Sequence, residues 1–361
     1  MKPPLLLTTG PVPISESVSS ILSQPMQYHR DKKFVLLFNQ VLENLKYFLQ
    51  TSYDVFVHSA SGTGGMEAVV ANFFSRGDRV IVVENGKFSE RWSQIAKVYG
   101  LQVSRVKIPW GQSIQPEQLK EEVKRVPDAK GIFLTHCESS TGALTDVGTL
   151  VPAIRDLTPA LVIVDAISSA GIIPLKMDAW QIDVVVTASQ KGLGLPPGLA
   201  IVALNDRAWQ RSEMADLPRF YFDFMRARQA WLLGRGGAFT PAIPLIAAAA
   251  HVLDEIVNLG LERIWEQRRA MASKFRGAMN DLELSIFPAQ PADGMTVVQI
   301  DHPLQAKKII ARLRDDYHIF VSGGQGQLQD LVLRIGHMVE VSEEQLHQFV
   351  TALETILSEA K

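Results

Sequence analysis

Short apolar runs, many of them β-branched, alternate with segments of helical periodicity between about residues 55 and 205. Nearly continuous apolar runs are typical of strands buried on both faces, which occur in sheets covered by helices. The runs that predict strands are Val55–His58, Val80–Glu84, Val103–Ile108, Gly131–His136, Leu161–Asp165, Asp183–Ala188 and Leu199–Leu204. The segments between them are long enough for crossover helices. This pattern predicts a large α/β domain with a mostly parallel seven-stranded sheet.

The pattern changes after residue 241, where a helical segment without strands extends to about residue 283. The later segments predict strands at Met295–Ile300, Ile319–Ser322 and Leu331–Ile335, and helices at Leu304–Tyr317 and Ser342–Ala360. Ser342 and Gln345 have the spacing of a capping box at the start of the last helix. We therefore expect an N-terminal arm (1–15), a large domain (16–255) and a smaller C-terminal α+β domain (256–361).

Composition narrows the class of protein. The chain has 361 residues, of which 47% are hydrophobic and 20% charged, and its formal net charge is −2. This balance gives no indication of a nucleic-acid or membrane-surface partner. The single cysteine, Cys137, excludes an internal disulfide and fits a reducing compartment. No apolar run approaches the ~20 residues that span a bilayer, so we expect a cytoplasmic protein.

A glycine-rich segment, Ser59-Ala-Ser-Gly-Thr-Gly-Gly-Met-Glu-Ala68, follows the first predicted strand and opens a helix. Backbone N–H groups at a helix start bind phosphate well, and the helix dipole assists them. Ser61 and Thr63 could add hydroxyl hydrogen bonds. A strand-to-helix turn that simply requires glycine is an equally good interpretation. The segment matches neither the dinucleotide-binding G-x-G-x-x-G pattern nor a P-loop.

Asp165 ends the predicted strand Leu161–Asp165, at the position where α/β folds place ligands. A buried carboxylate needs a cationic partner, and a protonated pyridine nitrogen would serve. The simpler interpretation of this residue is a helix N-cap.

Lys191 follows a strand-like run and precedes a rigid loop of glycines and prolines. Most lysines are solvated surface charges, but these neighbours favour partial burial. Burial lowers the pKa of a lysine and makes its amine nucleophilic toward an aldehyde.

Arg334 lies inside the apolar run Leu331–Ile335. A buried guanidinium must be paired, and its planar fork suits a carboxylate. That carboxylate could belong to a ligand or to an internal Asp or Glu.

Taken in this order along the chain, these segments resemble the class V (fold-type I) pyridoxal-phosphate-dependent aminotransferases. Within that class they are similar to the alanine–glyoxylate and serine–glyoxylate aminotransferase group. The resemblance covers essentially the whole chain. It also includes Thr9-Gly-Pro-Val-Pro13, His29-Arg30, Asn85-Gly-Lys-Phe-Ser-Glu-Arg91 and Thr135-His-Cys-Glu-Ser-Ser-Thr-Gly142.

The resemblance implies a role for each matching position. Lys191 would hold pyridoxal 5'-phosphate as a Schiff base, Asp165 would pair with its pyridine nitrogen, and Arg334 would anchor the substrate α-carboxylate. The other implied cofactor contacts are Ser61, Gly62 and Thr63 in the phosphate turn, Gln190 on the phosphate side, Phe88 and Ile167 on opposite ring faces, Ser139 beside the ring, and Thr240 from a partner subunit.

The implied reaction is a ping-pong amino transfer from a small amino acid, alanine or serine, to a keto acid, with glyoxylate as the expected acceptor. The resemblance also implies a homodimer, and no metal is expected.

One departure from the family pattern is Gly236-Gly237, where relatives often carry Tyr. This weakens the expected contact from Thr240. Cys137 replaces a common Gly and is interpreted as a small buried residue, and His136 as a packed histidine. His29 and Arg30 would lie at the substrate entrance, at the dimer interface or in a surface turn.

Two other functions are left by the sequence. One is a cysteine desulfurase or related lyase on the same fold, which would require a reactive cysteine on a mobile loop; only Cys137 is available. The other is a non-catalytic accessory subunit, which would not need Lys191, Asp165 and Arg334 together.

Overall fold

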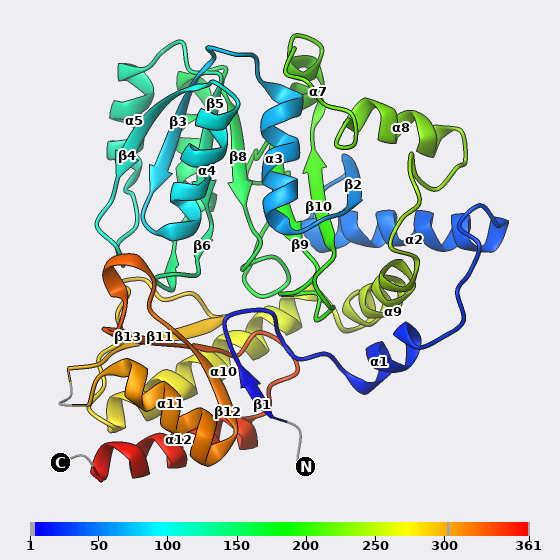
Figure 1. Ribbon diagram of the computed structural model, residues 1–361. Coiled ribbons are helices and arrows are strands. Elements are labelled where there is room, and N and C mark those ends of the chain that lie inside the picture. Colours follow the sequence, from blue (N-terminus) through cyan, green and yellow to red (C-terminus); the bar gives the residue numbers. More distant parts are fainter. Residues whose placement is uncertain (1–3, 302–303, 360–361) are drawn as a thin grey trace.

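The computed structural model describes residues 4–301 and 304–359 (Figure 1). A broad helix-covered sheet fills the upper part of the view, and a smaller sheet with its own helices lies below it. The strands are β1 (Leu5–Leu7), β2 (Asp54–Ser59), β3 (Arg79–Glu84), β4 (Gln102–Lys107), β5 (Gly131–Thr135), β6 (Cys137–Glu138), β7 (Ala143–Leu144), β8 (Leu161–Asp165), β9 (Val184–Ala188), β10 (Leu199–Leu204), β11 (Met295–Gln299), β12 (Ile319–Gly323) and β13 (Val332–Gly336).

Twelve α-helices and two short 3-10 turns connect the strands in the described part of the chain. They are α1 (Glu16–Leu22), α2 (Lys32–Leu49), α3 (Gly62–Phe73), α4 (Lys87–Val98), α5 (Pro116–Arg125), α6 (Val147–Ile154), η1 (Arg155–Leu157), α7 (Asp206–Ser212), α8 (Phe224–Leu232), α9 (Ile243–Leu259), α10 (Leu261–Asp281), α11 (Ala306–Tyr317), η2 (Gly326–Leu328) and α12 (Glu343–Ser358).

The large sheet has seven strands in the order β2-β10-β9-β8-β5-β3-β4. Strand β10 runs antiparallel to both of its neighbours, and the other adjacent pairs are parallel. Strands β2, β3, β5, β8 and β9 therefore share one direction, and their carboxyl ends lie at the same edge of the sheet. This confirms the predicted mostly parallel seven-stranded α/β architecture.

Two hydrophobic cores lie on opposite faces of this sheet, because successive side chains of a strand point to opposite sides. In β3, Val80 and Val82 join the core that α3, α4, α7 and α8 cover. Ile81 and Val83 join the core that α2, α5, α6 and α9 cover. Burial on both faces explains the nearly continuous apolar runs of the central strands.

The smaller sheet has the order β1-β12-β13-β11. Its N-terminal strand β1 pairs in parallel with β12, with Leu5 opposite Ile319, so the start of the chain completes a sheet built from its end. Helices α10, α11 and α12 contribute to the core of this unit. Ser342 and Gln345 form the predicted capping box: the Ser342 N–H donates to Gln345 Oε1 at 2.9 Å, and the Gln345 N–H to Ser342 Oγ at 3.2 Å.

All ten predicted strands are present, with ends that differ by two residues at most. The expected helix Ser342–Ala360 corresponds to α12, and Ala360 itself lies outside the described residues. Strand β4 differs in character from the prediction of a nearly continuous apolar run. It lies at the edge of the sheet, and exposed or half-buried residues occupy every position. Each face of this edge strand is only partly covered, because Val106 packs against one core and Val103 against the other.

Within the described ranges, no single helix combines the length and apolar character required to cross a membrane. Helices α9 and α10 meet that criterion only when joined as a pair, and they are bent by 87° at their junction.

Candidate active site

A cavity of about 250 Å³ lies at the carboxyl edge of the large sheet, where α/β folds bind ligands. Its wall contains nine of the eleven residues that the sequence assigned to the site. They are Ser61, Gly62, Thr63, Phe88, Ser139, Asp165, Ile167, Gln190 and Lys191. These residues come from segments that follow β2, β3, β5, β8 and β9, so the parallel order of the strands brings them together.

The glycine-rich segment forms the start of α3 and faces this cavity. Ser61 is the N-cap, and its side chain makes no capping hydrogen bond. The N–H groups of a first helical turn have no acceptor within the helix, and the dipole there favours an anion. Gly62 is required by space, because a Cβ there would lie 2.5 Å from Ile167 Cδ1. The turn is therefore suited to a phosphate group.

Asp165 ends β8 with only 4% of its surface exposed. Its Oδ1 accepts the Ile167 N–H at 2.9 Å. Burial raises the pKa of the Asp165 carboxyl to about 7, although the Ile167 N–H and the charge of Arg91 lower it. The carboxylate would be stabilised by a cation placed in the cavity.

Lys191 is 9% exposed and lines the same cavity. Burial lowers the pKa of its amine to about 8, an effect that Arg334 reinforces and that Cys137 and Asp165 oppose. With this pKa, about one tenth of the amine is unprotonated at pH 7, and an unprotonated amine is a nucleophile.

The N-terminal loop closes over this amine. Lys191 Nζ donates a hydrogen bond to the carbonyl oxygen of Thr9. Gly10 has a φ of +124°, and a Cβ at this position would overlap Cε and Nζ of Lys191. Both the backbone conformation and the space beside the lysine therefore require glycine.

Phe88 lies in the first turn of α4, and its half-buried ring forms part of the cavity wall. The Arg91 guanidinium lies 4.9 Å from the centre of this ring and donates to Thr63 Oγ1 at 3.0 Å. Because arginine has donors only, Thr63 is the acceptor in this hydrogen bond, and its own proton remains available to an anion. Arg91 thus connects the aromatic wall to the phosphate turn.

Arg334 is 5% exposed and lies in β13. It does not line the cavity wall, but it contacts Ser139, which does. Its Nε donates to the Gly323 carbonyl and its Nη1 to the Ser139 carbonyl, both at 2.7 Å. Among the described residues, no carboxylate forms an ion pair with it. The internal ion pair that the sequence left open is therefore not formed, and carbonyl oxygens orient the guanidinium instead.

Ser139 and Ile167 both line the cavity. The Ser139 hydroxyl donates to Ser168 Oγ at 2.5 Å, and Ser168 also belongs to the cavity wall. Ile167 lies next to Gly62 in this wall.

Thr240, unlike Arg334, has no contact with the wall of this cavity among the described residues. It is exposed and lies on the wall of a separate pocket, with Phe239 and Pro241. Arg30 donates to the carbonyl oxygens of Arg235 and Gly237 in the same loop, at 2.8 and 3.3 Å. A role for Thr240 in the cavity described above would require a second chain.

Several residues of the site received no role from the sequence. Gly10, Arg91 and Ser168 line the cavity, and Glu138 contacts the start of α4 beside it. Arg91 and Glu138 lie within two of the segments that resemble the aminotransferases, and this resemblance was the only indication in the sequence that they belong to the site. Their contacts depend on the packing of distant strands, which the sequence pattern does not specify.

Cys137 and His136 are buried, as expected. Burial raises the pKa of the Cys137 thiol to about 12, so the thiol is protonated at neutral pH. The His136 ring packs edge-on against Trp180, with ring centres 5.9 Å apart, and burial lowers its pKa to about 4. A protonated thiol is a poor nucleophile, and a histidine with so low a pKa carries no proton to donate at neutral pH.

The fold and this arrangement of amine, carboxylate and helix start define a fold-type I pyridoxal-phosphate-dependent transferase. More particularly, the chain belongs to the aminotransferase class-V family, whose model matches residues 14–349.

Individual relatives are similar over nearly their whole length. The small subunit of a soluble hydrogenase from Synechococcus sp. (strain PCC 6716) is 34% identical over 98% of this chain and 93% of its own. The L-aspartate–glyoxylate aminotransferase of Paracoccus denitrificans is 30% identical over 97% of this chain and 90% of its own. The crystal structure of an alanine–glyoxylate aminotransferase from Nostoc sp. matches with a TM-score of 0.95 and 28% identity, and the match covers 99% of this chain and 96% of that one.

The family uses pyridoxal phosphate, and the donor set of the cavity fits that group. Unpaired N–H groups at the start of α3 suit its phosphate. The buried Asp165 suits a protonated ring nitrogen, and the amine of Lys191 suits its aldehyde. The amide oxygen of Gln190 is also buried without a hydrogen-bond partner among the described residues, as expected for a polar group that faces a ligand.

Proposed function

We propose that this aminotransferase moves the amino group of a small amino acid, alanine or serine, to a keto acid, with glyoxylate as the acceptor. The observation that carries the proposal is that Lys191 and Asp165 line one cavity with the start of α3, and that Arg334 contacts Ser139 in the wall of that cavity. An amine, an acid and a carboxylate anchor are the groups that such a transfer requires.

Lys191 and Asp165 would divide the proton chemistry. When bound, pyridoxal phosphate supplies a ring that delocalises the electron pair left at the substrate α-carbon. Asp165 would keep a proton on the ring nitrogen, because the buried carboxylate gains most from a neighbouring cation. The Lys191 amine, with its pKa lowered to about 8, would take the α-proton and return it as a general acid–base catalyst.

Arg334 would bind the α-carboxylate of both donor and acceptor. Its guanidinium is oriented by the Gly323 and Ser139 carbonyls, so each acid would enter in the same orientation, and its α-carbon would face Lys191. One anchor for both acids fits a ping-pong order, in which the first keto acid leaves before the second enters.

The size of the donor would be limited by the loop at Thr9 and Gly10, which lies directly against Lys191. This favours small donors such as alanine and serine. The relative that is named for aspartate makes that acid the first larger donor to test.

We also propose a homodimer in which Thr240 of one chain contacts the phosphate of the other. The support is that Thr240 is exposed and away from its own cavity, on a loop that Arg30 holds. The remaining cofactor contacts would be those of the cavity wall.

A non-catalytic accessory subunit is the second candidate, because one relative is named as a subunit of a soluble hydrogenase. A cysteine desulfurase is disfavoured, since Cys137 is a buried strand residue with a protonated thiol. A single-turnover experiment separates the candidates. Holoenzyme is mixed with alanine, serine or aspartate in the absence of acceptor, and the keto acid is measured. We expect one equivalent per site, followed by arrest until glyoxylate is added. An accessory subunit would form none.

A further inference from the structure

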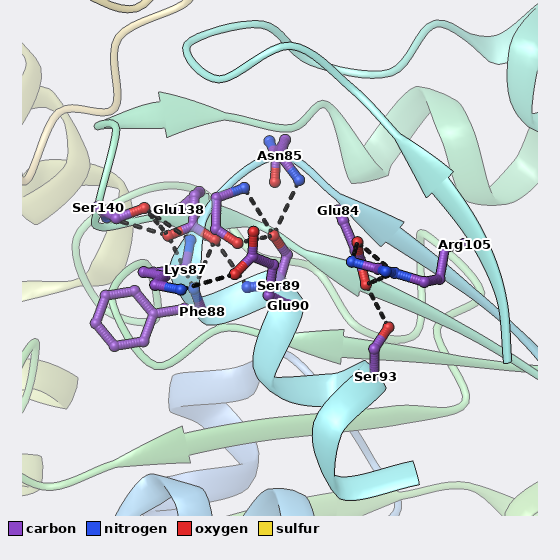
Figure 2. A network of polar contacts seen from close by, with 11 residues as sticks. Glu84, Asn85, Lys87, Phe88, Ser89, Glu90, Ser93, Arg105, Glu138 and Ser140 are labelled. Carbon is purple, nitrogen blue, oxygen red and sulfur yellow. Dashed lines mark hydrogen bonds and ion pairs between the residues drawn. The ribbon is translucent and has the colours of Figure 1, made fainter. Parts of the chain in front are cut away.

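Glu138 is a fully buried carboxylate that holds the first turn of α4. It accepts the N–H of Phe88 at 3.0 Å and that of Ser89 at 2.8 Å through Oε2. Its Oε1 accepts the Ser140 hydroxyl at 2.7 Å. Figure 2 shows the Glu138 carboxylate beside the first residues of α4. The Phe88 ring points away from this carboxylate.

The Phe88 and Ser89 N–H groups have no carbonyl acceptor within α4, and Glu138 supplies the acceptor for both. The first N–H groups of an α-helix lack acceptors within it, and a negative charge at this end is favoured by the dipole. Charge-assisted hydrogen bonds also offset the cost of burying the carboxylate. Gly86 leaves room for the group, since a Cβ there would overlap the Glu138 carboxyl.

The same segment also contacts Arg334 of β13. Ser139, the next residue, accepts Nη1 of Arg334 through its carbonyl oxygen at 2.7 Å. One short stretch of backbone therefore carries both the group that fixes Phe88 and the group that orients Arg334. Burial lowers the pKa of Arg334 to about 10, and the negative charge of Glu138 opposes this lowering.

We propose that Glu138 is a positioning residue that holds the Phe88 ring and the Arg334 guanidinium in register across the cavity. It acts through these two side chains and does not itself line the cavity wall. The inference rests on the proposed function, because it assigns Phe88 to the cofactor and Arg334 to the substrate.

A second buried carboxylate, at the end of β3, also contacts α4 and provides a matched control. Glu84 is 4% exposed, accepts Ser93 Oγ of α4 and pairs with Arg105 at 2.6 Å. Figure 2 shows this cluster further along α4, apart from the Glu138 contacts. None of its three residues belongs to the cavity wall. Glu84→Gln thus removes a buried charge that contacts Ser93 of α4, and it leaves the first turn of the helix unchanged.

The test compares Glu138→Gln with Glu84→Gln. In Glu138→Gln an amide nitrogen replaces one acceptor oxygen and faces N–H or hydroxyl donors. In the cofactor-free chain, we expect amide hydrogen exchange at Phe88 and Ser89 to become about tenfold faster. In the holoenzyme, we expect the pyridoxal-phosphate Kd and the donor KM each to rise about tenfold, with a smaller change in kcat. Glu84→Gln should lower Tm but leave these three quantities within twofold.

The proposal is overturned if Glu138→Gln lowers Tm as Glu84→Gln does and leaves amide exchange, cofactor Kd and donor KM unchanged. If Glu138→Gln does not fold, Glu138→Asp is measured in the same way, since it retains the charge but withdraws it by one methylene group. Wild-type chain is assayed first: failure of wild type to transfer an amino group contradicts the proposed function, whereas amide exchange in the cofactor-free chain still decides the role of Glu138.

Discussion

Lys191 Nζ donates its hydrogen bond to the carbonyl of Thr9, a residue 182 positions earlier in the chain. The contact joins the large sheet, which carries the lysine after β9, to the segment that follows β1 in the smaller sheet. The reactive amine is therefore held where the two sheets meet. Its surroundings depend on the N-terminal loop as much as on the strand that precedes it.

Gly10→Ala tests this dependence. The added Cβ would overlap the end of Lys191, and the φ of +124° disfavours any side chain. We expect kcat/KM to fall by at least about 100-fold, because displacement of a reacting group by even 1 Å has an effect of that size. Steady-state kinetics and the amount of tightly bound cofactor are the measurements.

Gly77→Ala is the matched control for backbone strain. Gly77 has a φ of +86°, and a Cβ there meets nothing within 4 Å. This variant should lose about 1 kcal/mol of stability and keep its activity. Equal activity losses in the two variants would show that strain, and not contact with Lys191, explains the effect at Gly10.

Asp165→Asn should change how the stability of the cofactor-free chain depends on pH. The pKa of Asp165 is raised by burial from 3.8 to about 7 in the folded chain, so the folded state binds the extra proton between these values. Wild type therefore loses stability relative to Asp165→Asn as pH rises from about 4 to 7, at roughly 1.4 kcal/mol per pH unit at most. The difference should be constant above pH 8.

Denaturant unfolding of both cofactor-free chains at several pH values measures this difference. The variant should also bind pyridoxal phosphate more weakly, although its cofactor-free form is the more stable one at pH 8. A stability difference that does not vary between pH 4 and 7 would contradict a raised pKa at Asp165.

Most residues of this site could be predicted because parallel strands bring the segments at their carboxyl ends together. Asp165 ends β8 and Lys191 follows β9, and the parallel direction of these strands places both residues at the carboxyl edge of the sheet. The edge strand β4 was less well described, because its residues are exposed or half-buried at every position. The pairing of β1 with β12 was not predicted either, since three leucines near a chain end do not indicate their partner.

Contacts that depend on packing between sheets were beyond the sequence. Arg334 could equally have paired with an internal acid, and only the structure shows that carbonyl oxygens hold it. Similarly, Glu138 gives no periodic signal, and its role depends on where α4 begins relative to β6.

Arg334→Lys tests the carboxylate anchor. Lysine keeps the charge but lacks the planar fork of donors. It cannot donate to the Gly323 and Ser139 carbonyls and also bind a carboxylate with two hydrogen bonds. We expect kcat/KM for both the donor and glyoxylate to fall by about 10- to 100-fold. Arg314→Lys, at an exposed arginine that pairs with neighbouring Asp315, should have no effect. A loss confined to one of the two substrates would contradict a shared anchor.

Thr240→Val tests the contact between chains. Loss of one hydroxyl hydrogen bond to phosphate should weaken cofactor binding by about tenfold. In mixed dimers of Thr240→Val with Lys191→Ala, the site that retains Lys191 would receive Thr240 from the other chain. Its affinity for the cofactor should then return to the wild-type value. Affinity that stays at the Thr240→Val value in mixed dimers would place the effect within one chain.

The most direct measurement concerns the amine of Lys191. Holoenzyme is reduced with borohydride, digested, and analysed by peptide mass spectrometry, with Lys191→Ala treated in parallel. We expect a pyridoxyl-phosphate group fixed to the peptide that contains Lys191 in wild type, and no fixed group in Lys191→Ala. A group fixed to another lysine in wild type, or no fixed group at all, would contradict it.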